Sequence, residues 1–594
     1  MVGLPYDCVA NPIGAVRLTF EKAVAGLPDA DPMLALGGKD WGVTDLFHRF
    51  LFEEDGLSRV PILDQSSIRW IMPNTLVRFR GMVQDMLGNE LYIGAFKDGS
   101  TWRTNKFTDV AARPMPPSCQ SCYSERLIFL SVPVPGQNQW TLDVSPPQVV
   151  QDKYEDVMSQ HGEKRRRDVT FDAMELNVQH MEMDASCSKK QREDEYTFQS
   201  SHSLVKDLEL EGVMQENKNH SDDASFSCLV KVYDLPEGHL KLNDVFEFIG
   251  VYTFNPELFD NDSTDHPAFD IVEDVSDHLP PTKVPRLHCL ICKKLAFQDF
   301  LSVSSALQPL PNPFVEIRGS LIGHLSAILG NDEVAAQCLL LHLLSRVRGK
   351  VDVVTVGKLS LNLTGFTRES ASLFGSRLND MITSLLPFSR VIPISVDYLN
   401  KATLQPRKNN QTGRLMMGEL QLAHGTHLTL DETHLQAGVL SSVGVENARM
   451  LKYLMEMQSV EYDFEFYKLD MTTDIQLLVI SEGKSNILPA DLVLPFHPTA
   501  YTPKTASREQ LEAWRWYLAN ARSLNCSSGL EMQTILQDEM VAAMREDRSL
   551  GFKDLSRLLT MAQLLSVSFG EGSLTLERWQ MVKELERLRK ERLR

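Results

Sequence analysis

The chain has 594 residues, 43% of them hydrophobic, and its formal net charge is −19 at pH 7. This length predicts three or more folded units, and the apolar content is sufficient to build their cores. No run of about eighteen apolar residues occurs, the first residues lack a basic region followed by an apolar stretch, and the cysteine count is odd, so we expect no membrane span, no secretory signal and reduced thiols inside the cell.

Residues 1–70 are expected to form a helical N-terminal segment. Apolar residues recur there at helical spacing and predict two core-facing stripes. The first stripe is Val16, Phe20 and Val24, and the second is Leu46, Phe47, Phe50 and Leu51.

Residues 71–150 and 227–300 are expected to be the two parts of one OB-like β-barrel. Alternating apolar and polar residues predict strands at 75–85, 90–96, 127–134, 228–233 and 245–254. Such barrels often bind single-stranded nucleic acid, and Arg78 and Arg80 on the first strand are compatible with that role. The net charge opposes it, so a scaffold or protein-contact role is favoured and DNA binding stays an alternative.

Residues 151–226 are expected to form a disordered acidic insertion within this barrel. Acidic residues outnumber basic ones, and aromatic and β-branched residues are scarce, so the segment cannot bury enough apolar area to order itself. It contains four consecutive basic residues, Lys164, Arg165, Arg166 and Arg167. We interpret them as a nuclear import signal, which predicts a nuclear protein; the alternative is a solvated charge run.

Two C-x-x-C pairs, Cys119/Cys122 and Cys289/Cys292, raise the possibility of a zinc site. The pairs are separated by far more residues than zinc modules usually allow, and the second lies in an apolar run where cysteine acts as a core residue. We therefore expect accidental pairs and no bound metal.

Residues 301–505 are expected to form an α/β domain of the AAA+ type. The apolar strand at 428–430 ends in Asp431 and Glu432, the arrangement with which such hydrolases hold magnesium and polarise water. A strand at 418–422 is expected before it, and another at 474–479 after it. The segment from Leu415 to Phe464 resembles the corresponding part of the replicative MCM helicases.

The phosphate-binding part of this predicted site is degenerate. A strand at 358–363 and a helix at 370–386 flank the expected loop, in which Ser370 fits the hydroxyl position but Glu369 replaces the phosphate-binding lysine. A carboxylate at that point repels a triphosphate. Lys358 is the only other candidate lysine, and an ATPase that uses it with Asp431 and Glu432 stays an alternative.

Other catalytic features are also missing from the sequence. Ser481 and Glu482 follow the strand at 474–479 where MCM ATPases have an asparagine, and the segment 488–495 contains no arginine finger. The losses together predict no hydrolysis and no nucleotide cofactor. Asp431 and Glu432 are then more simply interpreted as helix-capping acids.

Residues 506–594 are expected to form a helical lid. Apolar stripes predict helices at 507–524, 530–544, 552–569 and 575–588. The segment 554–563 resembles the MCM lid helix, and 575–588 resembles the final MCM helix.

Short motifs in a fixed order give the chain a family resemblance. They are V-R-F-R-G-M-V-Q-D-M from Val77, V-P-V-P-G from Val132, C-L-V-K-V-Y from Cys228, L-D-E-T from Leu430, Y-D-F from Tyr462 and I-S-E-G-K-S from Ile480. In this order they resemble the mini-chromosome maintenance complex-binding protein family.

The resemblance implies a nuclear, non-catalytic partner of MCM subunits in DNA replication. It implies action on MCM complexes at chromatin, including their unloading, a role in sister-chromatid cohesion and at most weak contact with DNA. MCM subunits assemble side by side through barrels and ATPase domains, so a chain of the same architecture without hydrolytic residues would mimic a subunit.

Overall fold

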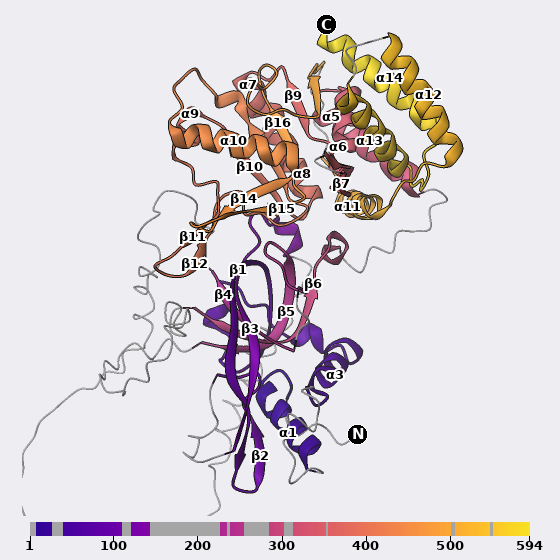
Figure 1. The fold of residues 1–594 in the computed structure, drawn as a ribbon. Helices are drawn as coiled ribbons and strands as arrows, with labels where there is room; N and C mark the ends of the chain where they lie inside the picture. The colour runs from indigo at the N-terminus through magenta and orange to yellow at the C-terminus, as the bar shows by residue number, and fades with distance from the viewer. Residues whose placement is uncertain are drawn as a thin grey trace, which may run out of the picture. The chain divides into compact units, whose positions relative to one another are not determined.

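The computed structural model describes residues 7–25, 40–109, 120–142, 226–234, 238–254, 284–301, 313–351, 354–499, 505–546 and 551–594. Three predicted features lie outside the described residues: the insertion up to residue 225, its basic residues Lys164, Arg165, Arg166 and Arg167, and Cys119. The described chain has mixed α/β content with several separate sheets (Figure 1). No helix in these ranges is long and apolar enough to cross a membrane.

The N-terminal segment is helical in two places. Helix α1 (Pro12–Val24) starts at the N-cap Asn11, and α3 (Val43–His48) continues into the π-helix η1 (Arg49–Glu53). The predicted core residues are buried except Leu46, which is half-buried. After η1 the predicted helical segment contains only the short 3-10 turns η2 (Gly56–Arg59) and η3 (Ser67–Arg69) before the first strand.

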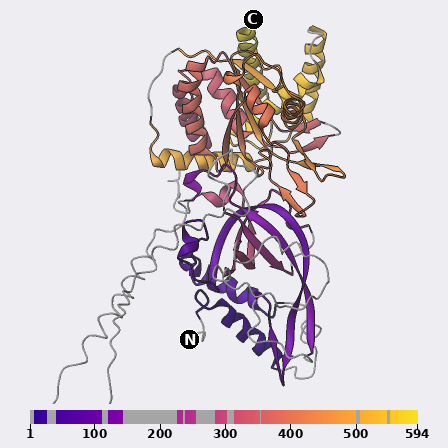
Figure 2. The same ribbon diagram turned by 90° about the vertical axis from the view of Figure 1, so that its left-hand side faces the viewer.

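The first sheet closes on itself. Its order is β2-β1-β3-β4-β6-β5, and β1 also pairs with β5, so five strands form a ring. All pairs are antiparallel except β4 with β6. The strands are β1 (Leu76–Asp98), β2 (Thr101–Thr104), β3 (Ser121–Val132), β4 (Cys228–Tyr233), β5 (Val245–Thr253) and β6 (Arg286–Lys294). Figure 2 shows the pronounced curvature of the indigo and violet strands.

Two strand predictions in this sheet need correction. The strands expected at 75–85 and 90–96 are one continuous strand, β1, whose register shifts at three places allow it to bend and pair with both β3 and β5. Strand β6 is not among the expected strands, because the sequence indicates only an apolar run around Cys289. In the structure it pairs with β4 and β5 and completes the ring. Gly250 on β5 is required there, because a Cβ atom would lie 2.2 Å from the carbonyl oxygen of His288.

The second sheet is parallel throughout, in the order β10-β13-β16-β9-β17. Its strands are β9 (Leu361–Thr364), β10 (Ser389–Pro393), β13 (His427–Asp431), β16 (Gln476–Ile480) and β17 (Leu492–Pro495). The connecting elements are α7 (Arg368–Ser370), η9 (Ala371–Gly375), α8 (Ser376–Leu385), α9 (Val396–Lys401), η10 (Glu432–His434) and α10 (Ser442–Met457). Helices α5 (Pro313–Ile328) and α6 (Glu333–Leu344) precede the sheet and share one apolar core with β9, β17 and the C-terminal helices.

Two smaller sheets belong to the same part of the chain. One has the order β12-β11-β14-β15, and the other is the hairpin of β7 and β8. These strands are β7 (Gly349–Val351), β8 (Val354–Val356), β11 (Arg407–Asn409), β12 (Arg414–Met416), β14 (Ser459–Asp463) and β15 (Lys468–Thr472). The strand expected at 418–422 is wrong: those residues form no strand, and Leu420 and Leu422 are buried as core side chains of a loop.

The C-terminal residues form four helices, as their apolar spacing predicts. They are α11 (Arg508–Ser523), α12 (Leu530–Glu546), α13 (Phe552–Ser568) and α14 (Leu576–Leu593). Ser507 caps α11 and Thr575 caps α14, each by accepting a backbone N–H bond. Helix α14 runs five residues beyond the predicted end, because Arg589 and Arg592 near its end bond to the carbonyl oxygens of Val493 and Pro495.

Buried hydrogen bonds connect the ring of strands to the parallel-sheet region. Gln84 on β1 donates to the carbonyl oxygen of Leu415 at 2.7 Å, and Gln421 donates to the carbonyl oxygen of Gln84 at 2.9 Å. A register shift of β1 falls at Gln84. The residues on either side of the gap at 143–225 thus belong to one unit.

Candidate functional site

The loop between β9 and α7 is where a nucleotide hydrolase would bind phosphate, and its backbone donors are occupied. Gly365 donates its N–H to the carbonyl oxygen of Glu482 at 2.9 Å, and Phe366 donates to that of Ser481 at 3.1 Å. A phosphate cradle needs such N–H groups free and pointing at the ligand. The chain segment after β16 therefore takes the bonds that phosphate oxygens would need.

An aromatic side chain fills the space beneath this loop. Phe366 is fully buried and stacks on Phe496, with ring centroids 4.6 Å apart and planes inclined by 8°. Gly365 has a φ of +91°, a conformation that glycine adopts without strain, and this turn directs Phe366 inward. The apolar contact fixes the loop in its closed form.

Glu369 and Ser370, the two predicted residues of the loop, lie in the first turn of the helix that follows. Thr367 and Ser370 form a reciprocal cap, in which the Ser370 hydroxyl oxygen accepts the N–H of Thr367 at 2.8 Å. Glu369 is exposed. The serine that fits the magnesium-binding position in sequence serves here as a helix cap.

Asp431 and Glu432 lie at the carboxyl end of β13 and differ in environment. Asp431 accepts bonds from the backbone N–H of Thr433 at 2.9 Å and from its hydroxyl at 2.6 Å, so it caps the turn η10. Glu432 is buried and accepts a bond from the Ser485 hydroxyl at 2.7 Å. Burial raises the pKa of the Glu432 carboxyl, although the bond from Ser485 partly opposes this.

The sequence analysis does not single out two residues at the carboxyl ends of these strands, Asn362 and Ser485. Asn362 on β9 donates to the Ser481 hydroxyl at 2.7 Å and accepts from the Ser485 backbone at 3.3 Å. The Asn362 side chain thus bonds to the Ser481 hydroxyl and the Ser485 backbone, and the Ser485 hydroxyl bonds to Glu432. A polar residue inside the apolar run L-N-L was the available signal, because a buried strand tolerates an asparagine only with partners.

Lys358 lies at the amino ends of the parallel strands, whereas Asp431 and Glu432 lie at their carboxyl ends. It precedes β9, whereas the two acids end β13, and β9, β16 and β13 are parallel. Its ammonium group forms an ion pair with Asp491, 2.8 Å from each carboxylate oxygen. The lysine required by the alternative ATPase hypothesis therefore does not meet the two acids.

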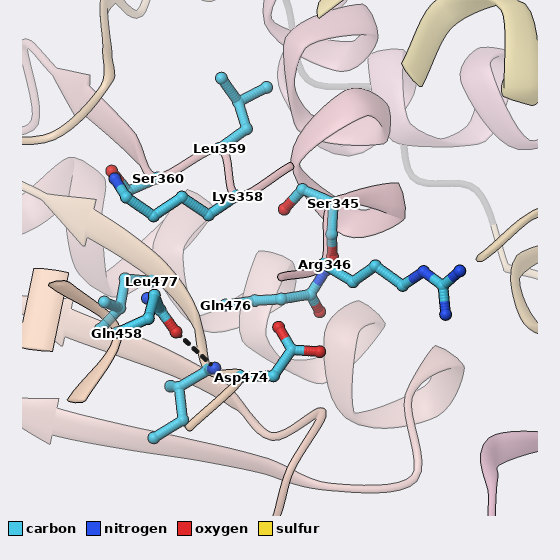
Figure 3. A pocket seen from close by; sticks show the side chains of 10 residues that line it. Ser345, Arg346, Lys358, Leu359, Ser360, Gln458, Asp474, Gln476 and Leu477 are labelled. Atoms are coloured by element: carbon cyan, nitrogen blue, oxygen red, sulfur yellow. Dashed lines mark hydrogen bonds between the residues drawn. The ribbon is translucent and has the colours of Figure 1, made fainter. Parts of the chain in front are cut away.

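A small pocket lies at the amino ends of these strands. It is lined by residues that precede or begin β9 and β16, including Lys358, Ser360, Asp474 and Gln476 (Figure 3). The Gln458 side chain accepts the backbone N–H of Ile475 at 2.8 Å, drawn as the dashed line. Glu369, Ser370, Asp431 and Glu432 do not line this pocket.

The arginines proposed for DNA binding are neutralised by Glu247 on the neighbouring strand β5. Arg78 is buried, and its guanidinium lies 3.9 Å from Glu247, while Arg80 bonds to the same carboxylate oxygen at 2.8 Å. Backbone phosphates require accessible cations. These two side chains do not form an exposed basic groove.

The cysteine pair that the structure describes belongs to the core. Cys289 is buried, and Cys292 is half-buried against the same apolar cluster. Across the described ranges, no group of three or more His, Cys, Asp or Glu side chains is arranged to hold a metal ion. Cys119 lies outside these ranges, so the expectation that Cys119 and Cys122 form only an accidental pair is not tested.

The fold and this site define a mixed α/β protein in which the predicted phosphate-binding loop bonds to another segment of its own chain. A family described as mini-chromosome maintenance replisome factor matches residues 47–593. The chain is 51% identical to the mini-chromosome maintenance complex-binding protein of Arabidopsis thaliana over all of both chains. It is 31% identical to the Salmo salar protein of that name over 99% of this chain and 97% of the relative, and 30% identical to the Homo sapiens protein over 99% and 98%. The chain belongs to the family of mini-chromosome maintenance complex-binding proteins.

Proposed function

We propose that this chain binds MCM complexes and acts in DNA replication as a non-catalytic factor that occupies the place of an MCM subunit. Relatives that this chain matches over nearly their whole length are named MCM complex-binding proteins. This name supports the binding role. Occupying a subunit's place would unload or remodel MCM complexes on chromatin and, through replication, support sister-chromatid cohesion. The proposed location is the nucleus, with chromatin reached through the MCM partner.

The mimicry rests on two fold assignments that are part of the proposal. The closed ring of five strands, with one parallel pair between β4 and β6, supports an OB-like barrel. The five parallel strands with β13 ending in Asp431 and Glu432 support a degenerate AAA+ core, and α11 to α14 support its lid. An MCM neighbour would then meet surfaces of the kind that a true subunit presents.

One observation carries the non-catalytic half of the proposal: the N–H groups of Gly365 and Phe366 already bond to Glu482 and Ser481. Hydrolysis would require this loop to open, Phe366 to leave its buried stack on Phe496, and Glu369 to tolerate a triphosphate beside it. Each change is unfavourable, so the ring position taken by this chain would lack a working ATP site.

The test is reconstitution from purified MCM subunits. The full chain is mixed with all subunits, complexes are separated by size-exclusion chromatography, and each subunit is identified by mass spectrometry. We expect a stable complex that lacks at least one ring subunit. A full ring with this chain merely attached contradicts the substitution, and no co-elution at all contradicts the binding.

A further inference from the structure

Strands β14 and β15 form a hairpin with one apolar face, whose exposed part (464–469) we call the aromatic hairpin. Phe466 at its tip is 88% exposed, Tyr467 is 60% exposed and Leu469 is 46% exposed. Cross-strand pairing puts Phe464, Tyr467 and Leu469 on one face, and Glu461, Asp463, Lys468 and Asp470 on the other. Several large apolar side chains together on one surface are typical of an interaction site.

This hairpin is held rigidly before any partner binds. Phe464 donates its N–H to the carbonyl oxygen of Tyr467 at 3.0 Å, and the two rings stack with centroids 5.2 Å apart. Glu465 takes the left-handed conformation, with a φ of 67°, and its N–H bonds to the Asp463 carboxylate at 2.8 Å. The backbone that carries Phe466 is therefore held at the tip by these bonds, so binding would cost little entropy for ordering the turn.

The base of the hairpin is fixed as well. Tyr462 is fully buried, and its hydroxyl bonds to the Asn243 side chain at 2.8 Å. On the charged face, the Tyr453 hydroxyl of α10 donates to Asp470 at 3.0 Å. The bonds to Asn243 and to α10 thus support strands β14 and β15 (Figure 1), which carry the exposed apolar residues.

The charge left free around the hairpin is negative. Lys468 lies 2.7 Å from Glu461, Arg449 lies 2.6 Å from Glu446, and Arg407 lies 3.8 Å from Asp463. Among the described residues, Glu465 and Asp470 have no basic side chain within ion-pair distance. A nucleic-acid strand stacked on the rings would bring phosphates towards these carboxylates, which repel them.

We propose that the aromatic hairpin is an anchor that inserts Phe466 into an apolar pocket, rimmed by basic side chains, on a protein partner. This inference rests on the proposed function, in which that partner is the MCM complex. The apolar tip supplies the buried contact, and Glu465 and Asp470 meet the basic rim, so binding weakens as salt is raised.

The experiment measures binding of the full-length chain to purified MCM complex by biolayer interferometry. Phe466→Ala and the double variant Phe466→Ala/Leu469→Ala remove the exposed anchor without touching the core. Trp70→Ala is the matched control, because Trp70 is 81% exposed on a different element. Glu465→Lys tests the charge, and circular dichroism checks that every variant is folded.

We expect Phe466→Ala to raise Kd at least about tenfold, Glu465→Lys to raise Kd mainly at low salt, and Trp70→Ala to leave Kd unchanged. Native binding with an unchanged Kd for Phe466→Ala overturns the inference and leaves the proposed function standing. Absence of native binding removes both.

Two parallel measurements test whether the hairpin binds nucleic acid or a second copy of this chain instead. A labelled single-stranded oligonucleotide reports nucleic-acid binding, and sedimentation velocity reports self-association. If Phe466→Ala abolishes oligonucleotide binding or dissociates a dimer while its Kd for the MCM complex is unchanged, the protein-partner assignment is wrong.

Discussion

Glu432 keeps its carboxyl group in a buried position where only the Ser485 hydroxyl bonds to it. Because its folded-state pKa lies above the unfolded one, the ionised group costs stability at pH values above the folded pKa. This cost disappears as the pH falls below the unfolded pKa. A residue that would polarise water in a hydrolase thus weakens the fold here at neutral pH.

Glu432→Gln is therefore expected to raise the free energy of unfolding at pH 7.5, since the amide oxygen still accepts from Ser485 without a buried charge. The gain should shrink towards pH 4. Urea denaturation measures it, with the exposed Glu369→Gln as the control that changes nothing. Magnesium-dependent ATP hydrolysis above background in the native protein, lost in Glu432→Gln, would restore the ATPase hypothesis.

A buried histidine pair also makes the stability depend on pH. His342 and His427 lie with their Nε2 atoms 3.1 Å apart, and His342 Nδ1 lies 2.7 Å from the carbonyl oxygen of Leu359. A carbonyl only accepts, so His342 donates from Nδ1 and its Nε2 accepts from His427. Burial lowers the pKa of His342 to about 4 and also lowers the pKa of His427.

Because the folded pKa of His342 is depressed, the unfolded chain binds the proton first as the pH falls below about 6.5. Stability is complete above that pH and is lost towards pH 4. We expect His342 alone to remove about 2 kcal/mol of the free energy of unfolding at pH 5. Urea denaturation at pH 7.5 and 5.0 measures the loss, and His342→Asn, which does not titrate, should show a smaller difference between the two pH values.

At the scale of elements, the C-terminal helix α14 closes the core of the parallel-sheet region. Arg592 bonds to both carboxylate oxygens of Asp332 at 2.6 and 2.9 Å, and the Asp332 side chain is fully buried. Asp332 also caps α6 by accepting the N–H of Ala335. One ion pair therefore ties the last turn of the chain to the start of a helix 260 residues earlier.

Arg592→Ala is expected to lower the free energy of unfolding by about 3 kcal/mol, because it leaves a buried carboxylate without its cation. The control lies in the same helix: Arg587 pairs with Glu584 and Glu591 in solvent, so Arg587→Ala should leave the free energy of unfolding nearly unchanged. Chemical denaturation followed by tryptophan fluorescence measures both. Equal costs would show that the Arg592 pair contributes no more than a surface pair.

At the scale of the whole molecule, the proposed nuclear import and the proposed partner binding use different parts of the chain. The proposed import residues, Lys164, Arg165, Arg166 and Arg167, lie in the polar insertion, outside the described residues. The aromatic hairpin and the loop between β9 and α7 lie in the part of the chain that the structure describes. Changing one should therefore leave the other intact.

Replacing Lys164, Arg165, Arg166 and Arg167 with alanine should move the protein from nucleus to cytoplasm without changing its melting temperature. Fluorescence microscopy of residues 145–226 fused to an inert reporter measures import free of any MCM partner. The control is the same fusion with Lys189 and Lys190 replaced by alanine, which should remain nuclear. If the unmodified fusion stays cytoplasmic, the basic run is only a solvated charge cluster.

Local sequence by itself determined the elements whose signals are local. Helices α11 and α13 follow apolar stripes, β13 and β16 follow buried runs, and the motif order matched the family that the comparisons identify. These features could be read because helical spacing, caps and buried runs are properties of neighbouring residues.

Only the tertiary structure decided how the site is closed. The pairing of β1 with β5, the bonds from Gly365 and Phe366 to Glu482 and Ser481, and the ion pair of Lys358 with Asp491 all join residues more than a hundred positions apart. Such contacts leave no periodic signal in one sequence, because each depends on a sheet bringing distant segments together. The sequence predicted that this loop lacks a phosphate-binding lysine, and the fold showed that the N–H groups of Gly365 and Phe366 bond to Glu482 and Ser481.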